Sequence, residues 1–562
     1  MRKFYKLTPA LIFLSGCITA ANAQDLATIA GQKPFTVAGS LDLRGIFYHA
    51  QGIPARRPPF SYLLSGSPVF SLYGISIPVS FSISEQQRDF RQPFNQFGLS
   101  PTYKWIAVHG GYRNIEFSPY TLAGYTMLGG GIELTPGRFR FGAMYGRLNK
   151  ATEIDTTTGA LQPYSFSRKG YALKAGYGSD EKFIELSFLS AHDDSTSVQK
   201  SIPDSVKTIT PAANAVASIR GAWNMARKFY FEADAGISVY TYNTGSTIGN
   251  PADLQKISKA FKSIVPVNAS SQANLAYSAG ITYKAANYSL KLTYRYVDPE
   301  FQSMGAYFFN NDFRNITLSP EFSVANRTVR FNGSIGLQKD NLRKQKEQTT
   351  TRVIGSANVS WDITSRLGID ANYVNYSTKA APQVVLVNNK YLLAQTSHNL
   401  SATPRYIVTN DRHTHVVLLS YNYSTLVDFN PDTKELNHIR TGVGFLNYNL
   451  NFNKTGWSVS AGLNRSINKY YSGKALIYGF SLGGSKNFLQ NRLQLATTNS
   501  FSIVKQMGSA IVINAGLTGA YNLAAQHRFS ARWNLLANRP ETIVIDPRFT
   551  ENTAELGYTW TF

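Results

Sequence analysis

The most informative feature of this sequence is the strict alternation of side chains over residues 553–562. Counting back from the last residue, every second position is apolar or aromatic: Phe562, Trp560, Tyr558, Leu556 and Ala554. The positions between them are small or polar: Thr561, Thr559, Gly557 and Glu555. Successive side chains of a β-strand point to opposite faces, so this segment has one face suited to hydrocarbon and one suited to water. The pattern predicts the last strand of a membrane β-barrel, with its aromatic end at the membrane interface.

The N-terminal residues have the pattern of a secretory signal peptide. A basic start and a largely apolar stretch lead to a small-x-small site that ends at Ala23. The apolar stretch is too short, and wrongly flanked, for a membrane-spanning helix. We therefore predict cleavage between Ala23 and Gln24, so that residues 1–23 are removed and residues 24–562 form one barrel domain.

A second cleavage site overlaps this signal peptide. Residues 14–17 (Leu-Ser-Gly-Cys) match the box at which lipoproteins are cut, and cleavage there would leave Cys17 lipidated at the mature N-terminus. We favour cleavage after Ala23 because a barrel needs no lipid anchor. Since Cys17 is the only cysteine, the mature chain then has none, which excludes disulfides and thiolate metal ligands.

The composition fits a membrane protein built from strands rather than from helices. The mean hydropathy is −0.20, and no stretch after the signal peptide reaches the ~18 to 20 apolar residues of a spanning helix. Aromatic residues make up 13% of the chain, as the interfacial girdles of a barrel require. The net charge of +23 is scattered, and the longest basic run is 343–346. We therefore expect no nucleic-acid partner. The excess of basic residues is better explained by binding to lipopolysaccharide phosphates or by a lumen that favours anions.

The middle of the chain repeats one hairpin pattern. In residues 273–297, apolar and aromatic residues alternate with small or polar ones on both sides of a tight turn at 285–287. From residue 169 onward, tight turns alternate with long polar loops, as periplasmic turns and outer loops do in such barrels. The pattern predicts an all-β fold, a single antiparallel up-and-down transmembrane barrel of about 26 strands. Prolines between residues 50 and 125 interrupt the alternation, so counts of about 22 or 24 remain alternatives.

The C-terminal alternation resembles the signature of bacterial outer-membrane β-barrels, which end in Phe with aromatics at alternate positions. Tyr558, Trp560 and Phe562 hold those positions and would act as the assembly signal. With the Ala-Asn-Ala-Gln cleavage site and the tyrosine-rich strands, the whole chain resembles large, mostly uncharacterised outer-membrane barrels of Bacteroidota. The resemblance implies a Gram-negative outer membrane, the barrel assembly machinery as a partner, and lipids and lipopolysaccharide as neighbours. Strand-like alternation begins at Phe35, which leaves no room for the plug domain of energy-coupled receptors.

The same alternation separates charges that face the lumen from residues that face lipid. The predicted lumen-lining cations are Arg138, Arg140, Lys174, Arg220, Lys291, Arg295, Arg330 and Arg532. The predicted inward carboxylates are Glu185, Glu232, Asp234, Asp362 and Glu555. Two interpretations fit: a net-basic wall that favours anions, or a ladder of ion pairs that solvates the interior.

Two segments have a composition suited to packing inside the lumen or against a partner. A barrel of this size cannot be filled by its own side chains, because its diameter grows with strand number. Glu85–Tyr120 combines charges, prolines and aromatics in a way unlike a strand, and Asp298–Arg314 is too aromatic for a purely solvated loop.

Candidate chemistry is sparse. His192 stands beside two aspartates and a serine, as a general base could, but a polar loop at a membrane boundary has the same composition. His413 and His415 share a strand face within reach of one metal ion, yet no third ligand is identifiable nearby. We therefore predict no catalytic, metal or cofactor site and no enzymatic activity, with an outer-membrane hydrolase as the remaining enzyme class.

The leading functional prediction is a porin-like channel or passive transporter for polar or anionic solutes. The alternative is a non-enzymatic scaffold of a secretion, assembly or adhesion machine. In that case partner proteins, such as lipoproteins or periplasmic subunits, would close its lumen.

Overall fold

The computed structural model describes residues 33–85, 96–153, 164–198, 209–249, 261, 263–306, 310–346, 348–382, 394–430, 433–506, 508–541 and 547–562. The predicted signal peptide, its cleavage site at Ala23 and Gln24, and Cys17 lie outside these residues.

Strands make up most of the described chain, as 29 segments of one antiparallel sheet. The segments up to residue 149 are mostly short: β1 (Phe35–Ala38), β2 (Ser40–Gln51), β3 (Phe60–Gly66), β4 (Val69–Leu72), β5 (Ile75–Ser84), β6 (Gln96–Leu99), β7 (Thr102–Tyr103), β8 (Ile106–Asn114), β9 (Thr126–Leu134) and β10 (Phe139–Asn149). The next nine are longer: β11 (Ser167–Gly178), β12 (Phe183–Asp194), β13 (Ala213–Met225), β14 (Phe229–Thr241), β15 (Ser271–Lys284), β16 (Tyr288–Val297), β17 (Phe313–Val324), β18 (Val329–Asp340) and β19 (Gln348–Asp362). The last ten complete the sheet: β20 (Leu367–Pro382), β21 (Ala394–Thr409), β22 (His413–Asp428), β23 (Ile439–Phe452), β24 (Trp457–Tyr470), β25 (Gly473–Phe488), β26 (Leu493–Lys505), β27 (Ser509–Ala524), β28 (His527–Pro540) and β29 (Phe549–Thr561). One helical turn, α4 (Lys434–Asn437), lies between β22 and β23.

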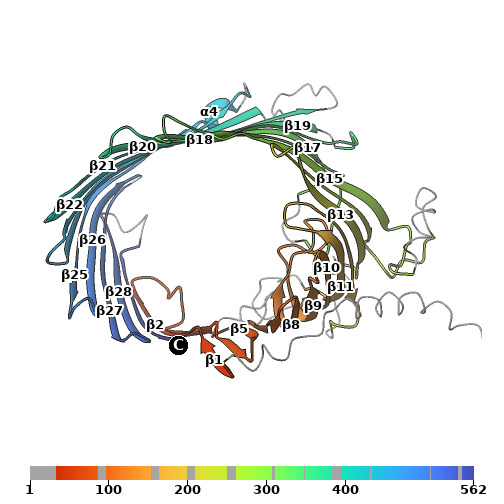
Figure 1. The fold of residues 1–562 in the computed structure, drawn as a ribbon. Coiled ribbons are helices and arrows are strands. Elements are labelled where there is room, and N and C mark those ends of the chain that lie inside the picture. Colours follow the sequence, from red (N-terminus) through yellow and green to blue (C-terminus); the bar gives the residue numbers. More distant parts are fainter. Residues whose placement is uncertain are drawn as a thin grey trace, which may run out of the picture.

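The segments close into an antiparallel ring of 26 strands, because three of those strands are each broken into two segments. β1 pairs with β4 and β2 pairs with β3, so β1 and β2 are two parts of one strand and β3 and β4 are two parts of the next. β6 and β7 likewise both pair with β5 and with β8. Pairing of β2 with β29 closes the ring (Figure 1). The predicted fold class and the count of about 26 strands are confirmed.

Prolines lie at two of the three strand breaks near the N-terminus, and Gly39 lies at the third, between β1 and β2. Pro68 lies between β3 and β4, and Pro101 lies between β6 and β7. Proline has no N–H to donate to a ladder, so it interrupts strands without preventing the chain from returning to the sheet. Pro78 stays within β5, where its carbonyl accepts a bond from Ser100 N at 2.9 Å. The alternatives of fewer strands are wrong because these prolines bend strands and do not remove them.

The outer face of the ring is apolar. Ile281, Leu292 and Leu318 stand opposite one another on β15, β16 and β17, and their side chains are exposed. Tyr283 and Tyr288, beside the β15–β16 turn, pack at 5.8 Å between ring centroids. An apolar band bordered by aromatic girdles is what the hydrocarbon layer of a membrane requires. Across the described part of the chain, no helix has both the length and the apolar character needed to cross a membrane.

The C-terminal residues complete the closure. The backbone of Phe562 exchanges two hydrogen bonds with Gly39, at 2.9 and 3.0 Å. Trp560 packs against Phe562 and against His527 of β28, with ring centroids 4.8 and 6.2 Å apart. The terminal strand is therefore paired on both edges, which leaves no open edge in the ring.

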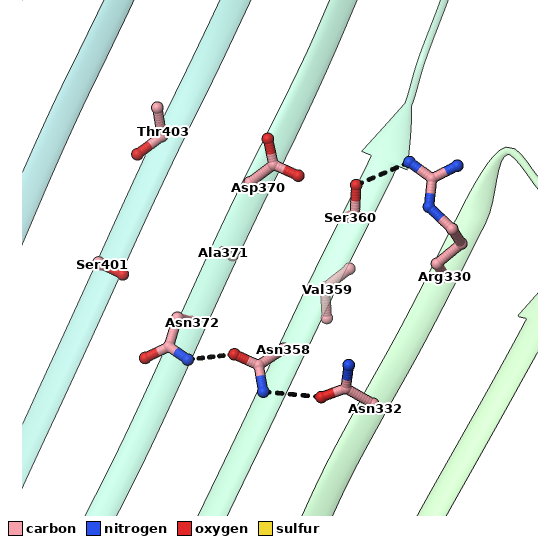
Figure 2. A pocket seen from close by; sticks show the side chains of 10 residues that line it. All are labelled: Arg330, Asn332, Asn358, Val359, Ser360, Asp370, Ala371, Asn372, Ser401 and Thr403. Carbon is pink, nitrogen blue, oxygen red and sulfur yellow. Dashed lines mark hydrogen bonds between the residues drawn. The ribbon is translucent and has the colours of Figure 1, made fainter. Parts of the chain in front are cut away.

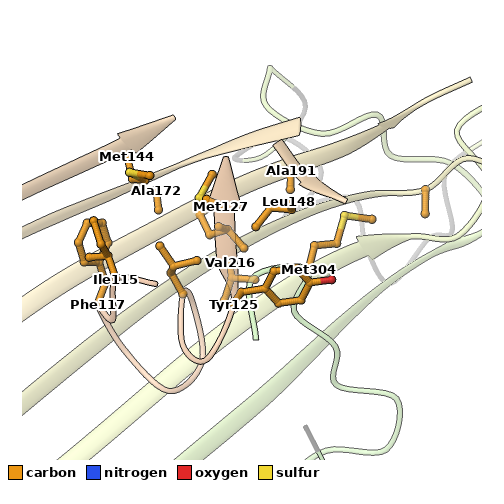
Figure 3. Packing of buried hydrophobic residues seen from close by; sticks show 13 residues of the cluster. Ile115, Phe117, Tyr125, Met127, Met144, Leu148, Ala172, Ala191, Val216 and Met304 are labelled. Atoms are coloured by element: carbon orange, nitrogen blue, oxygen red, sulfur yellow. The ribbon is translucent and has the colours of Figure 1, made fainter. Parts of the chain in front are cut away.

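A compact core lies inside the ring, on one side of the wall. It forms where the loop 115–125, between β8 and β9, packs on inward residues of the wall (Figures 1 and 3). Phe117 and Leu122 of this loop are buried together with Met144 of β10 and Val216 of β13. The loop 298–306, between β16 and β17, joins the core through Met304.

The predicted inward segments need one correction. Residues 96–114 form β6, β7 and β8 of the wall, so the inward loop is 115–125 rather than Glu85–Tyr120 as a whole. Residues 86–95 lie outside the described residues. For Asp298–Arg314 the expectation of packing is met over 298–306, where Phe301 is fully buried against Tyr120.

Candidate functional site

The strand register identifies the inner face of the wall. A single row of opposed positions crosses β10 to β16 through Arg140, Gly176, Glu185, Arg220, Asp234, Ser278 and Arg295. Lys174 and Lys291 stand an even number of residues from members of this row, so they share its face. The buried side chains of Met144 and Val216 also share it and contact the inward loops. The row therefore faces the interior of the ring.

Ion pairs between strands hold several of these cations; the Arg220 pair joins adjacent strands, and the Arg140 and Lys291 pairs each reach across an intervening strand. They join Arg140 Nη1 to Glu185 Oε1 at 3.1 Å, Arg220 Nε to Asp234 Oδ2 at 4.0 Å, and Lys291 Nζ to Glu232 Oε1 at 2.5 Å. Arg140 also bonds Asp180 at 2.7 Å. The Glu185 side chain is only 7% exposed, and such a carboxylate is costly unless it is paired. The arrangement matches the ion-pair ladder more closely than an array of free cations.

The remaining predicted cations differ in setting. Lys174 pairs with Glu133 at 3.3 Å and lies 5.0 Å from the Phe117 ring centre. Arg295 lies 5.3 Å from the centre of the Phe313 ring. Arg138 belongs to the β9–β10 turn, where its carbonyl accepts a bond from Gly178 N at 2.7 Å.

Arg532 stands opposite Glu555 across β28 and β29. Glu555 itself pairs with Arg44 of β2 at 3.6 Å. This group lies where the ring closes, and it brings together charges from both ends of the chain.

A second charged group lies on β18 to β21. Asp362 pairs with Arg330 at 3.1 Å and with Arg405, and Arg405 also pairs with Asp370. Beside it, three asparagines on adjacent strands form a hydrogen-bonded chain (Figure 2). Its members are Asn332, Asn358 and Asn372.

The two inward loops are bonded to each other and to the wall. Ala123 N donates to Gly305 O at 3.0 Å, and Ser303 Oγ donates to Thr121 O at 3.0 Å. The buried Asn214 of β13 accepts from Met304 N at 2.9 Å. Burial raises the pKa of the Tyr120 phenol, while hydrogen bonding to Ser278 opposes the rise. The loops are thus an ordered lining on one side of the lumen.

His413 and His415 are held in other interactions, and the His192 side chain is exposed beside an ion pair of Asp193. Asp193, next to His192, forms a bidentate pair with Arg168, with bonds of 2.7 and 3.1 Å. His415 Nδ1 bonds the Tyr448 hydroxyl at 2.9 Å, and His413 packs on Phe452. Within the described ranges, no three His, Cys, Asp or Glu side chains are grouped so that they could hold a metal ion.

One polar group is not predicted by any pattern in the sequence. Ser100 Oγ bonds His109 Nδ1 at 2.7 Å, and His109 Nε2 lies 3.3 Å from Glu133 Oε2. Arg113 also donates to the Ser100 hydroxyl. A serine, an imidazole and a carboxylate in line are the components of a nucleophilic site. No local pattern reveals this group, because Ser100 lies between β6 and β7 and meets His109 of β8 and Glu133 of β9 only through the pairing of these strands.

Comparisons with known proteins assign the chain to no family. No family model matches it, and no curated protein matches it. Solved structures similar in outline include OccAB2 of Acinetobacter baumannii, at 11% identity and a TM-score of 0.29 over 63% of this chain and 92% of that one. The P pilus usher PapC translocation pore is 9% identical, with a TM-score of 0.37 over 94% of this chain and 99% of that one. The FrpB iron transporter of Neisseria meningitidis is 10% identical, with a TM-score of 0.40 over 96% of this chain and 83% of that one. Such low TM-scores carry no functional argument, so the architecture rests on the strand register.

Proposed function

We propose that this chain is an integral outer-membrane barrel that lets polar solutes, neutral or anionic, diffuse across the membrane. One observation carries the proposal: a closed ring with an apolar outer face and a polar inner face. On β16, exposed Leu292 lies between Lys291 and Thr293, which share the inner face. Closure of the ring pairs the backbone groups that lipid cannot satisfy.

The width of the ring supports a water-filled passage. Rings of 16–18 strands already leave an aqueous channel. The inward loops pack on the wall between β8 and β17. Elsewhere on the inner wall, on β28, the inward side chains of Arg528, Arg532 and Asn534 are exposed. An ordered loop lining on one side and an exposed polar wall on the other suit a channel whose bore is narrowed but not filled.

The paired charges support weak selectivity among polar solutes. Because Lys291 pairs with Glu232 and Arg330 with Asp362, the local charge of the wall is smaller than its number of cations suggests. A strong anion filter needs cations whose field is not compensated nearby. We therefore expect neutral and anionic polar solutes to pass, with only a modest preference for anions from the basic excess.

Solute uptake by proteoliposomes tests this proposal. Liposomes that hold the purified protein should swell in isotonic sucrose and in isotonic gluconate, whereas protein-free liposomes should not. Exclusion of both solutes would contradict the proposal. If that barrel also copurifies in fixed ratio with lipoproteins or periplasmic subunits, the scaffold alternative would take its place.

A further inference from the structure

A shallow cavity of about 350 Å³ lies on the inner wall between β18 and β21. Figure 2 shows its lining, which comes from four adjacent strands. The polar side chains that line it are Arg330, Asn332, Asn358, Ser360, Asp370, Asn372, Ser401 and Thr403. The volume is at the lower end of the range for small-molecule sites. Four strands at a spacing of roughly 4.8 Å span about 14 Å, so an elongated ligand fits better than a compact one.

The charges around this cavity compensate one another. Arg330 and Arg405 stand against Asp362 and Asp370, and three ion pairs connect the four groups. Two cations and two carboxylates in contact have little net field, so the cavity does not select an ion by charge. They still present donors and acceptors in fixed planes.

The asparagine chain adds donors and acceptors to the floor of the cavity. Asn372 Nδ2 donates to Asn358 Oδ1, and Asn358 Nδ2 donates to Asn332 Oδ1 at 2.8 Å. The row of three asparagines therefore presents the amide donor Nδ2 of Asn332 at one end and the carbonyl acceptor Oδ1 of Asn372 at the other. A ligand with several hydroxyl groups can both donate and accept, so it can use both ends at once.

Two aromatic side chains lie on the same inner face outside the cavity, one beyond its β21 edge and one farther along β20. Thr403 bonds Ser420 at 3.3 Å, and Ser420 stands opposite Phe445 of β23. Tyr376 stands four residues beyond Asn372 on β20 and so shares its face. Phe445 is 39% exposed and Tyr376 is 41% exposed. An exposed aromatic on a water-facing wall can cover the apolar face of a passing ligand.

We propose that this cavity, hereafter the β18–β21 subsite, binds a neutral oligosaccharide. The many hydroxyl groups of an oligosaccharide can bond the amide, guanidinium and carboxylate groups of the cavity. The apolar faces of its sugar rings can pack on Phe445 and Tyr376. Its linked rings suit the elongated shape of the cavity. The inference rests on the proposed function, because it names a class of polar solute for the same lumen. Binding is weak and reversible, as passage requires, since a solute held tightly could not leave.

The test uses the purified barrel and neutral trisaccharides, with Asn358→Leu as the variant. Leucine is close in size to asparagine and removes the link between both neighbouring amides. The matched control is Asn534→Leu, on the inner face of β28. Block of the single-channel current by maltotriose and by raffinose is measured at two salt concentrations. Equilibrium dialysis of radiolabelled maltotriose is measured on the same proteins and does not depend on conduction.

We expect Asn358→Leu to bind maltotriose about tenfold more weakly than the unmodified protein, and Asn534→Leu to bind it equally well. Phe445→Ala should also weaken binding, and block should not change with ionic strength because the ligand is neutral. A conducting barrel that neither trisaccharide blocks or binds overturns the subsite and leaves the channel intact. Equal loss in both asparagine variants also overturns it. A barrel that binds maltotriose through Asn358 but does not conduct would instead overturn the proposed function.

Discussion

Leu292 and Thr293 are consecutive residues of β16 with different surroundings. Leu292 is exposed on the outer face between Ile281 and Leu318, while Thr293 stands between Gly280 and Thr317 on the inner face. The surroundings of each residue follow from the period of two and need no knowledge of the tertiary structure. The alternation in the sequence therefore predicts both positions.

This pair gives a direct prediction of stability. Leu292→Arg should cost roughly 2–4 kcal/mol, because it places a cation in hydrocarbon, and Thr293→Arg should cost much less. Urea unfolding of the two variants refolded into lipid vesicles measures the difference. Equal costs, or the reverse order, would mean that the two faces of β16 are exchanged.

The Ser100 group gives a prediction about reactivity. The Ser100 hydroxyl accepts a bond from Arg113, and the His109 side chain is only 10% exposed. A carbonyl substrate needs access to the hydroxyl and donors for its oxyanion. We therefore expect a fluorophosphonate probe to leave the unmodified protein unlabelled. Labelling that Ser100→Ala abolishes would contradict the non-enzymatic prediction and identify a hydrolase.

At the scale of elements, the sequence predicts strands well and inward loops poorly. The count of 26 could be made because tight turns and alternation recur from residue 169 onward. In 96–114, prolines and aromatics obscure the alternation, so three wall segments resemble an irregular loop. Residues 115–125 lack a periodic signal, and their burial depends on Met304 and Val216, which are distant in sequence. The ion-pair partners of the lumen cations can also be predicted once the strand register is known. The Ser100, His109 and Glu133 group cannot be predicted in this way, because Ser100 lies at the break between β6 and β7.

The inward loops give a prediction at this scale. Asn214 accepts from Met304 N at 2.9 Å and donates to Ser238 Oγ at 2.8 Å. In Asn214→Leu, the Met304 N–H loses its partner, which costs about 1–3 kcal/mol. Hydrogen exchange over residues 298–306 should therefore be faster, while Asn224→Leu, near a turn at the other end of β13, should leave it unchanged. Unaltered exchange in Asn214→Leu would mean that apolar packing alone holds the loop.

For the whole molecule, closure is the property on which the others depend. β29 is paired on both edges, and Phe562 bonds Gly39 through two backbone hydrogen bonds. A ring of this size encloses more space than its wall can fill. The sequence predicts this closure from the final strand alone, but it does not specify how far the loops narrow the bore. That depends on contacts among loops that no local pattern encodes.

Closure can be tested at the C-terminus. Phe562→Asp places a charge beside Trp560 at the interface and removes the predicted assembly signal. We expect the variant to be missing from outer-membrane fractions as a heat-modifiable species. Thr561→Ser, a conservative change at the adjacent position, should insert normally. Normal insertion of Phe562→Asp would show that the terminal aromatic is dispensable.

Single-channel conductance in planar bilayers tests the central claim most directly. The purified protein should give stable current steps, and replacing residues 118–122 of the inward loop with a Gly-Ser linker should raise the conductance without breaking the barrel. A ring whose bore is narrowed by packed loops predicts both results. A correctly folded barrel that stays closed to ions, with the loop present and with it replaced, would contradict the account.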